Sequence, residues 1–220
     1  MTEFTKWRSL VDGERIRAIP DSDLYYDITE DSVDESNNIV QDVIGDNNAE
    51  SVGDISLTED SSVGHGFFVN LDADNHLEVE NNPISIDDPF SVGAEIVVDN
   101  PVDDGTVSQW SDGNKIIRMA ISDEVIWIAY WDGSSWADVA SHSEPSTPYN
   151  IDLFGTWNPD GESVELYLNE SPSTGSDRPR SSTAEENFSI GGEFGDRGLD
   201  EGVARFAYWG EIVDASEFTI

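Results

Sequence analysis

The 220-residue chain contains 47 acidic residues and ten basic ones, so its formal net charge at neutral pH is -37. It has no cysteine, which excludes disulfide bonds, thiolate metal sites and a cysteine nucleophile. No apolar run approaches the ~18 residues of a membrane span, and such an acidic chain should not bind nucleic acid, whose phosphates contact lysine and arginine.

The first twenty residues differ from the rest because they carry four basic residues against three acidic ones, a net charge of +1. Their apolar residues follow no single period, and Pro20 closes the segment. We expect residues 1–22 to form an arm that docks onto a partner; the alternative is a first strand of the main domain. Buried aromatic rings would supply affinity, and arginine would bind carboxylates bidentately. The predicted docking residues are Phe4, Lys6, Trp7, Arg8, Arg15 and Arg17.

Residues 23–220 alternate apolar and polar side chains with a period of two, which is typical of strands. The pattern is clearest in Phe90–Val98, Ile117–Ile121, Val125–Trp131, Trp136–Ala140, Val164–Leu168 and Ala204–Trp209. Asp132-Gly133 predicts a hairpin turn. Residues 29–54 show the least pattern, and residues 171–186 are predicted to be a long surface loop. About a dozen short strands predict an all-β, antiparallel β-sandwich.

Four stretches occur in a recognisable order: FFVNLDADNHLEVE (67–80), FSVGAEIVVDN (90–100), TWNPDGESVELYLNES (156–171) and FSIGGEFGDRGLDEGVARFAYWGEIVDASEF (188–218). Together they resemble the laminin-G-like and concanavalin A-like jelly roll. The resemblance implies one jelly-roll domain over residues 23–220. This domain resembles those of virion surface proteins from haloarchaeal viruses. It implies little about function, because this fold includes lectins, glycosidases, adhesion modules and spacers.

An acidic cluster, Asp72, Asp74 and Glu78, is the first candidate for catalysis. The jelly-roll glycosidases carry Glu-x-Asp-x-x-Glu along one strand, whereas here the first position is Asp and Asn75-His76 interrupts the strand. We therefore expect a solvated turn and a protein that is not an enzyme. The histidines lack a paired serine or cysteine and are predicted to lie at the surface: His65, His76 and His142.

Tryptophans beside acidic turns predict a glycan-binding surface, because a sugar stacks on an aromatic ring while polar groups bind its hydroxyls. Trp131 and Trp136 flank the Asp132-Gly133 turn, and two other tryptophans end strands beside Asp-rich loops. The alternative is that most of these rings fill the core. The candidate ligand-binding residues are Trp131, Asp132, Trp136, Trp110 and Trp157.

No organic cofactor is expected. Ca²⁺ or bound salt ions are the candidates for a metal, because the loops are rich in the oxygen ligands that Ca²⁺ takes. Examples are Asp99-Asn100 and Asp103-Asp104. The sequence defines no ligand set, because carboxylates cluster in so acidic a chain without a metal.

The charge indicates an extreme halophile or its virus, because molar salt shortens the Debye length to about 3 Å and weakens repulsion between carboxylates. An acidic protein with basic partners is the alternative. We expect a structural, non-enzymatic protein on the capsid or tail of a halophilic archaeal virus, which binds host-surface glycans. The chain starts at Met1 without an export signal, so assembly would occur in the host cytoplasm. Its arm would contact other virion proteins, and the protein would form homo-oligomers.

Two alternatives belong to other classes of protein. One is a secreted or cell-surface haloarchaeal carbohydrate-binding or adhesion module. The other, which the sequence favours less, is a glycoside hydrolase.

The first prediction concerns salt. Dilution to about 0.1 M restores a Debye length of about 10 Å, so neighbouring carboxylates repel again. We expect loss of near-ultraviolet circular dichroism, or aggregation, below about 0.5 M salt. A thermal midpoint that is the same in molar and millimolar NaCl would contradict the halophilic interpretation.

Overall fold

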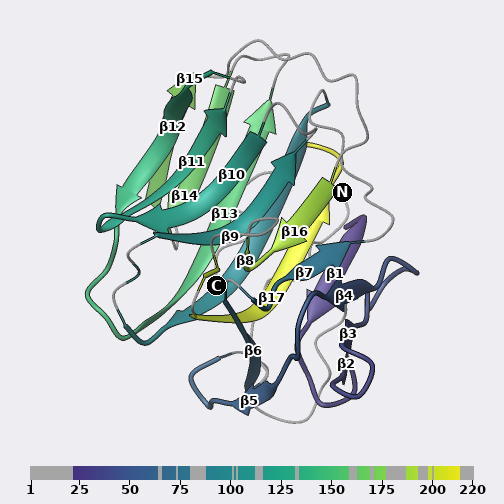
Figure 1. The fold of residues 1–220 in the computed structure, drawn as a ribbon. Helices are drawn as coiled ribbons and strands as arrows, with labels where there is room; N and C mark the ends of the chain where they lie inside the picture. The colour runs from purple at the N-terminus through teal and green to yellow at the C-terminus, as the bar shows by residue number, and fades with distance from the viewer. Residues whose placement is uncertain are drawn as a thin grey trace.

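The computed structural model describes residues 22–63, 66–72, 74–79, 88–100, 102, 104–111, 116–131, 134–158, 163–168, 171–176, 187–192, 198–199 and 201–213. Within these residues all regular structure is β, with seventeen strands and no helix. The strands form two antiparallel sheets that pack face to face (Figure 1). The predicted all-β sandwich is therefore confirmed. The docking residues proposed for the arm, Phe4 to Arg17, lie outside the described residues.

Sheet A has eight strands, of which seven form a continuous path and β1 pairs beside them with β17. In spatial order the seven are β15 (Ser171–Ser176), β14 (Ser163–Leu168), β13 (Tyr149–Asn158), β8 (Phe90–Val98), β17 (Glu201–Trp209), β6 (Phe67–Leu71) and β5 (Leu57–Glu59). The eighth, β1, spans Leu24–Asp27.

Sheet B has nine strands. In spatial order they are β12 (Trp136–Ser143), β11 (Val125–Trp131), β10 (Ile116–Ser122), β9 (Asp104–Ser111), β16 (Asn187–Ile190), β7 (Leu77–Val79), β4 (Ala49–Ser51), β3 (Ile39–Val40) and β2 (Val33–Asp34). The hairpin of β11 and β12 thus lies at one end of this sheet.

The core lies between the sheets because alternate side chains of each strand point inward. Aromatic rings fill its centre. The ring centroids of Phe90 and Trp110 lie 5.1 Å apart, and Trp110 stacks on Phe188 at 5.3 Å. Trp157 and Tyr130 add a further pair at 5.9 Å. These residues join the two sheets into one apolar unit.

Contacts between the sheets close the sandwich at both sides. At one side, the Ser141 amide donates to Ser173 Oγ at 3.3 Å, which joins β12 to β15. At the other, Asp42 forms a bridge with Tyr26 of β1. The buried Asp42 carboxylate accepts hydrogen bonds from the amides of Tyr25, Ile44 and Asn47 at 3.1–3.3 Å. It therefore orders the loop that follows β3.

Two regions differ from the sequence prediction. The weakly patterned residues 29–54 contain β2, β3 and β4. The predicted loop 171–186 begins with a strand, β15, which pairs with β14 over its whole length. Such short or edge strands are held by backbone hydrogen bonds and leave polar side chains in solvent, so they lack the apolar alternation on which the prediction rested.

A row of charged residues crosses the outward face of sheet A. Asp27, Arg205, Glu95 and Asp152 occupy directly opposed positions on β1, β17, β8 and β13. The Arg205 guanidinium makes a buried ion pair with Glu95. Three carboxylates thus lie in one row with one arginine. Burial, together with the neighbouring Glu95 charge, raises the pKa of Asp152 to about 7, although Arg205 acts in the opposite direction.

This raised pKa gives a prediction for stability. The folded chain retains a proton on Asp152 that the unfolded chain releases above its ordinary pKa of 3.8. Stability from this group is therefore lost as pH rises from about 4 to about 7, by up to ~1.4 kcal/mol per pH unit. Asp152→Asn should be more stable than the wild type at about pH 8, and the difference should vanish near pH 4.

The measurement is urea unfolding of both proteins in molar NaCl across this pH range. The exposed Asp54 gives a matched control, because Asp54→Asn removes the same charge from the surface. An equal gain from Asp54→Asn at high pH would show that general repulsion, and not the charged row, causes the effect.

Candidate functional site

The outward face of β11 carries two half-buried tryptophans. Ile126, Ile128 and Tyr130 point into the core and are buried. Trp127 and Trp131 therefore point outward, on the same face of the strand, with Ala129 between them. The period-two alternation predicted for Val125–Trp131 is thus confirmed.

The hairpin predicted at Asp132-Gly133 joins β11 to β12. Trp131, the last residue of β11, lies directly opposite Trp136, the first residue of β12. Asp132 and the side chain of Trp136 lie outside the described residues. The structure thus shows that Trp131 and Trp136 pair across the hairpin and leaves their role in binding a prediction.

The Trp127 ring is held in place by a hydrogen bond to the neighbouring strand. Its Nε1 donates to Ser122 Oγ of β10 at 2.7 Å. On β12, Ser141 lies opposite Trp127 and Ser143 opposite Val125, and both serines are exposed. The ring is therefore oriented before any ligand binds, and hydroxyl groups lie on the strands beside it.

A buried polar pair lies next to Ala129 on the neighbouring strands of the same sheet. Arg118 of β10 lies opposite Ala129, and Gln109 of β9 lies opposite Arg118. Arg118 Nε donates to Gln109 Oε1 at 2.9 Å, and Arg118 is only 1% exposed. Sequence reasoning missed this pair, because only the register of β9 against β10 brings the two residues together.

The proposed binding residues Trp110 and Trp157 are core residues, each only 1% exposed. Their predicted place at a ligand-binding surface was wrong, and the alternative, that these rings fill the core, holds for both. Trp110 alternates with the outward Gln109 and stacks on Phe188. Trp157 lies opposite Phe90, another core residue. Both rings fill the space between the sheets, so a ligand on the surface cannot stack on them.

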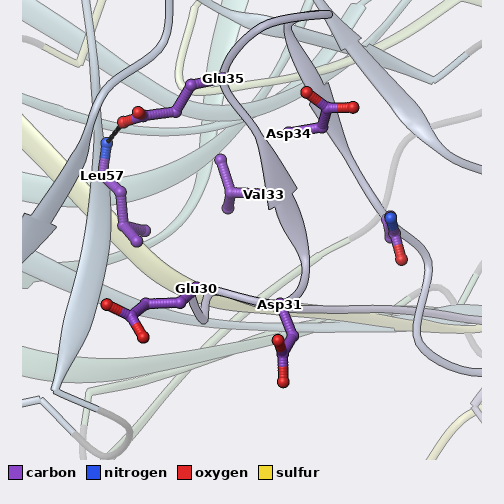
Figure 2. Close-up of a pocket in the computed structure, with 7 residues that line it drawn as sticks. Glu30, Asp31, Val33, Asp34, Glu35 and Leu57 are labelled. Atoms are coloured by element: carbon purple, nitrogen blue, oxygen red, sulfur yellow. Dashed lines mark hydrogen bonds between the residues drawn. The ribbon is translucent and has the colours of Figure 1, made fainter.

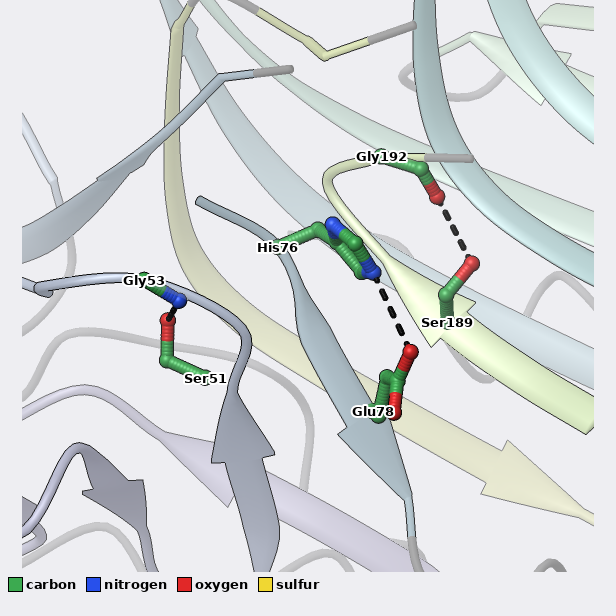
Figure 3. A network of polar contacts seen from close by, with 6 residues as sticks. All are labelled: Ser51, Gly53, His76, Glu78, Ser189 and Gly192. Atoms are coloured by element: carbon green, nitrogen blue, oxygen red, sulfur yellow. Dashed lines mark hydrogen bonds and ion pairs between the residues drawn. The ribbon is translucent and has the colours of Figure 1, made fainter. Parts of the chain in front are cut away.

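His76 is also buried, at 2% exposure, which corrects its predicted place at the surface. Figure 3 shows its ring directed toward Glu78, with His76 Nε2 at 3.4 Å from Glu78 Oε1. A Cβ atom at Gly192 would lie 2.5 Å from His76 Cβ, so the turn after β16 needs glycine there. Nearby, Ser189 Oγ donates to the Gly192 carbonyl at 2.6 Å rather than to the histidine. Each of these two hydrogen bonds is local, one beside β7 and one in the turn after β16, and β7 and β16 are joined by their backbone pairing.

The acidic segment after β6 is a turn, as predicted. Asp72 Oδ1 accepts hydrogen bonds from the amides of Asp74 and Asn75 at 2.8 and 2.9 Å. β6 ends at Leu71 and Glu78 belongs to β7. The three acids therefore do not follow one strand, unlike the glycosidase pattern. That the protein is not an enzyme stays a prediction.

A second surface feature is an acidic groove of about 490 Å³ beside β2 (Figure 2). Glu35 Oε1 accepts a hydrogen bond from the Leu57 amide at 2.6 Å and thereby ties the groove to β5. Its lining residues are Glu30, Asp31, Val33, Asp34, Glu35, Gln41 and Leu57. Across the described ranges no group of three or more potential ligands is arranged to hold a metal ion. Those ranges also contain no helix long and apolar enough to cross a membrane.

No protein-family model and no curated protein sequence matches this chain. Solved structures do match its fold. Domain 4 of AbnA, a GH43 extracellular arabinanase from Geobacillus stearothermophilus, solved in complex with arabinotriose, is 16% identical at a TM-score of 0.70. The match covers 88% of this chain and 94% of that domain.

Two botulinum neurotoxin structures give similar matches. The binding domain of botulinum neurotoxin DC in complex with SialylT is 12% identical, with a TM-score of 0.68. The serotype D/C binding domain is 13% identical, with a TM-score of 0.67. Each match covers 90% of this chain but only 50% of the toxin chain. At these identities the likeness establishes the β-sandwich fold.

The burial of the tryptophans generates a stability prediction. Trp110→Ala or Trp157→Ala should lower the free energy of unfolding by about 3–5 kcal/mol, because each removes a buried ring. Trp131→Ala should cost clearly less, since its ring is half-buried. Urea unfolding in molar NaCl measures all three. A loss for Trp131→Ala as large as that for Trp110→Ala would place Trp131 in the core.

Proposed function

We propose that this chain is a non-catalytic carbohydrate-binding domain and that the outward face of β11 is its binding face. One observation carries the proposal. Trp110, Trp157 and Trp209 are almost fully buried, whereas Trp127 and Trp131 are only half-buried, on one face of one strand. A large aromatic ring that stays partly in water loses part of its hydrophobic stabilisation. A surface that binds no ligand has no need of such rings.

The chemistry of this face suits a sugar. An indole ring offers a flat apolar surface for the carbon-bound face of a pyranose or furanose. Ser122, Ser141 and Ser143 place hydroxyl groups on the strands around Trp127, and hydroxyls can both donate to and accept from sugar hydroxyls. Because Ser122 already fixes the Trp127 ring, little conformational entropy is lost on binding.

The structural neighbours support the same class of ligand. A domain of this fold was solved with arabinotriose bound, and another with SialylT. The arabinanase domain is covered almost completely by this chain, whereas the chain spans about half the length of the toxin binding domains. Arabino-oligosaccharides are therefore the first probes to test.

The setting we propose is the surface of a virion from a halophilic archaeal virus, where the domain would bind host glycans. The net charge of -37 and the basic, aromatic residues 1–20 support it. A cell-surface or secreted module with the same binding face is the alternative. Detection of the protein in purified virions separates the two.

The test of binding is a glycan array in molar NaCl, including arabinotriose and linear arabinan. Wild-type protein should bind at least one glycan, and Trp131→Ala and Trp127→Ala should each weaken that binding about tenfold, or ~1.4 kcal/mol. Tyr167, half-buried on the outward face of sheet A, provides the control: Tyr167→Ala should bind like the wild type. Absence of binding to any glycan, or binding that neither tryptophan variant changes, would refute the proposal.

A further inference from the structure

We propose that residues 1–20 fold back across the outward face of sheet A and cover it as a third layer of the sandwich. This inference concerns the sheet opposite the tryptophan face, so it does not depend on carbohydrate binding. It also bears on the expected docking of the arm, because residues held on their own domain would have to leave this face before they bound another protein.

The outward face of sheet A is buried, although it points away from the space between the sheets. The residues that alternate with the core residues of β8 and β17 face outward. They include a tryptophan and an ion pair, and the following are at most 4% exposed: Ser91, Glu95, Val97, Arg205, Ala207 and Trp209. Phe154 of β13 and Tyr25 of β1 continue the face and are buried as well. An outward sheet face reaches such burial only when other parts of the chain lie on it.

Two described segments cover opposite ends of this face. At one end, Ser91 Oγ donates to the Glu211 carbonyl and accepts from the Val213 amide, both at 2.9 Å. Val213 then packs on the aromatic residues of the face. At the other end, Asn150 Nδ2 donates to the Ser62 carbonyl at 2.9 Å. Residues 211–213 and the turn after β5 therefore lie over the two ends of the face.

The charged row lies between these ends, where it crosses β8 at Glu95. Its members Asp27 and Arg205 are only 7% and 3% exposed. Burial, ahead of the neighbouring Glu95 charge, raises the pKa of Asp152 to about 7. Water is thus largely excluded from the middle of the face. Because the two segments above lie at its ends, a further segment must cover the middle.

Charge favours residues 1–20 as that segment. Of the segments of five or more residues outside the described ranges, only residues 1–20 carry a net positive charge; the others, 80–87, 177–186, 193–197 and 214–220, are net negative. A negative segment would add charge to a face that already holds three carboxylates and one arginine. Salt screens this repulsion poorly because the row is buried.

The arm also begins at the right place and is long enough. The Asp23 amide donates to the Tyr208 carbonyl at 2.9 Å, and the Asp23 carboxylate accepts from the Gly210 amide at 2.6 Å. The arm therefore joins β1 beside the end of β17. From there the row at Asp27 is four residues away, or roughly 13 Å, whereas twenty extended residues span up to roughly 70 Å. The apolar residues that the arm would bury on the aromatic face are Phe4, Trp7, Leu10, Ile16 and Ile19.

Because the chain has no cysteine, one introduced thiol reports on the face. Asp152→Cys places it in the charged row, and its rate of alkylation in molar NaCl measures how often the cover opens. Phe4→Ala combined with Trp7→Ala should raise this rate at least about tenfold, because two rings leave the cover. Phe218→Ala, in the acidic segment 214–220, should leave the rate unchanged. Ser141→Cys, exposed on sheet B, gives the rate of an open thiol.

Charge variants test the choice of segment in the same assay. Arg15→Ser combined with Arg17→Ser should raise the rate, whereas Arg178→Ser combined with Arg180→Ser, in the segment 177–186, should not. The near-ultraviolet circular dichroism of each variant shows whether it is folded. An unchanged rate in the arm variants, or an equal increase in the variants of the other two segments, overturns the proposal.

A second measurement leaves the face unaltered and separates the chain's own arm from that of another copy. A nitroxide on Ser9→Cys should broaden the amide NMR signals of Glu95 and Arg205 more than that of Arg118 on sheet B. When nitroxide-labelled chains are mixed with isotope-enriched chains that carry no nitroxide, the enriched chains should show no broadening. Broadening in this mixture would assign the face to the arm of a second copy. No broadening of Glu95 and Arg205 in either sample would place the arm elsewhere, and either result overturns the proposal.

Discussion

Repulsion among the carboxylates of a chain with net charge -37 is the constraint that the apolar core must overcome. The core does so by placing aromatic rings from both sheets in direct contact, with Phe90 against Trp110 and Trp110 against Phe188. Because this packing is not electrostatic, it persists in molar salt, where the repulsion itself is largely screened. On the halophilic interpretation, high salt would weaken the force that opposes folding and would add no new contacts.

Two of the scarce basic residues are buried rather than exposed to solvent. Arg118 and Arg205 are both almost fully buried on the outward faces of their sheets. Arg205 pairs with Glu95 and Arg118 bonds to Gln109. Salt screens exposed charges far more than buried ones, so these two cations keep their interactions where surface ion pairs lose most of theirs. The cost of burial is visible at Asp152, whose pKa is raised by desolvation and by the neighbouring Glu95 charge, although Arg205 acts in the opposite direction.

The alternation of apolar and polar residues was enough to predict the sandwich, the β11–β12 hairpin and the turn at Asp72. It could not decide which tryptophans line the core. Trp110 and Trp131 both end strands beside polar loops, yet Trp110 is inward and Trp131 outward. In β11 all residues from Val125 to Trp131 are aliphatic or aromatic. The sequence pattern therefore could not show which face of this strand points into the core. Pairs such as Arg118 with Gln109, and rows such as Asp27 to Asp152, depend on strand register, which joins residues far apart in the sequence.

The molar salt that the net charge predicts would also limit how such a surface can recognise a ligand. Exposed charge pairs, which steer and hold many complexes, lose most of their range at a Debye length of about 3 Å. Stacking on an indole ring and hydrogen bonding to a hydroxyl carry no such dependence. Half-buried tryptophans with serines around them, and with the nearby Arg118 buried, therefore suit the proposed recognition in concentrated salt. In the proposed function the acidic residues would maintain solubility, while the outward side of β11, whose described residues carry no charge, would provide specificity.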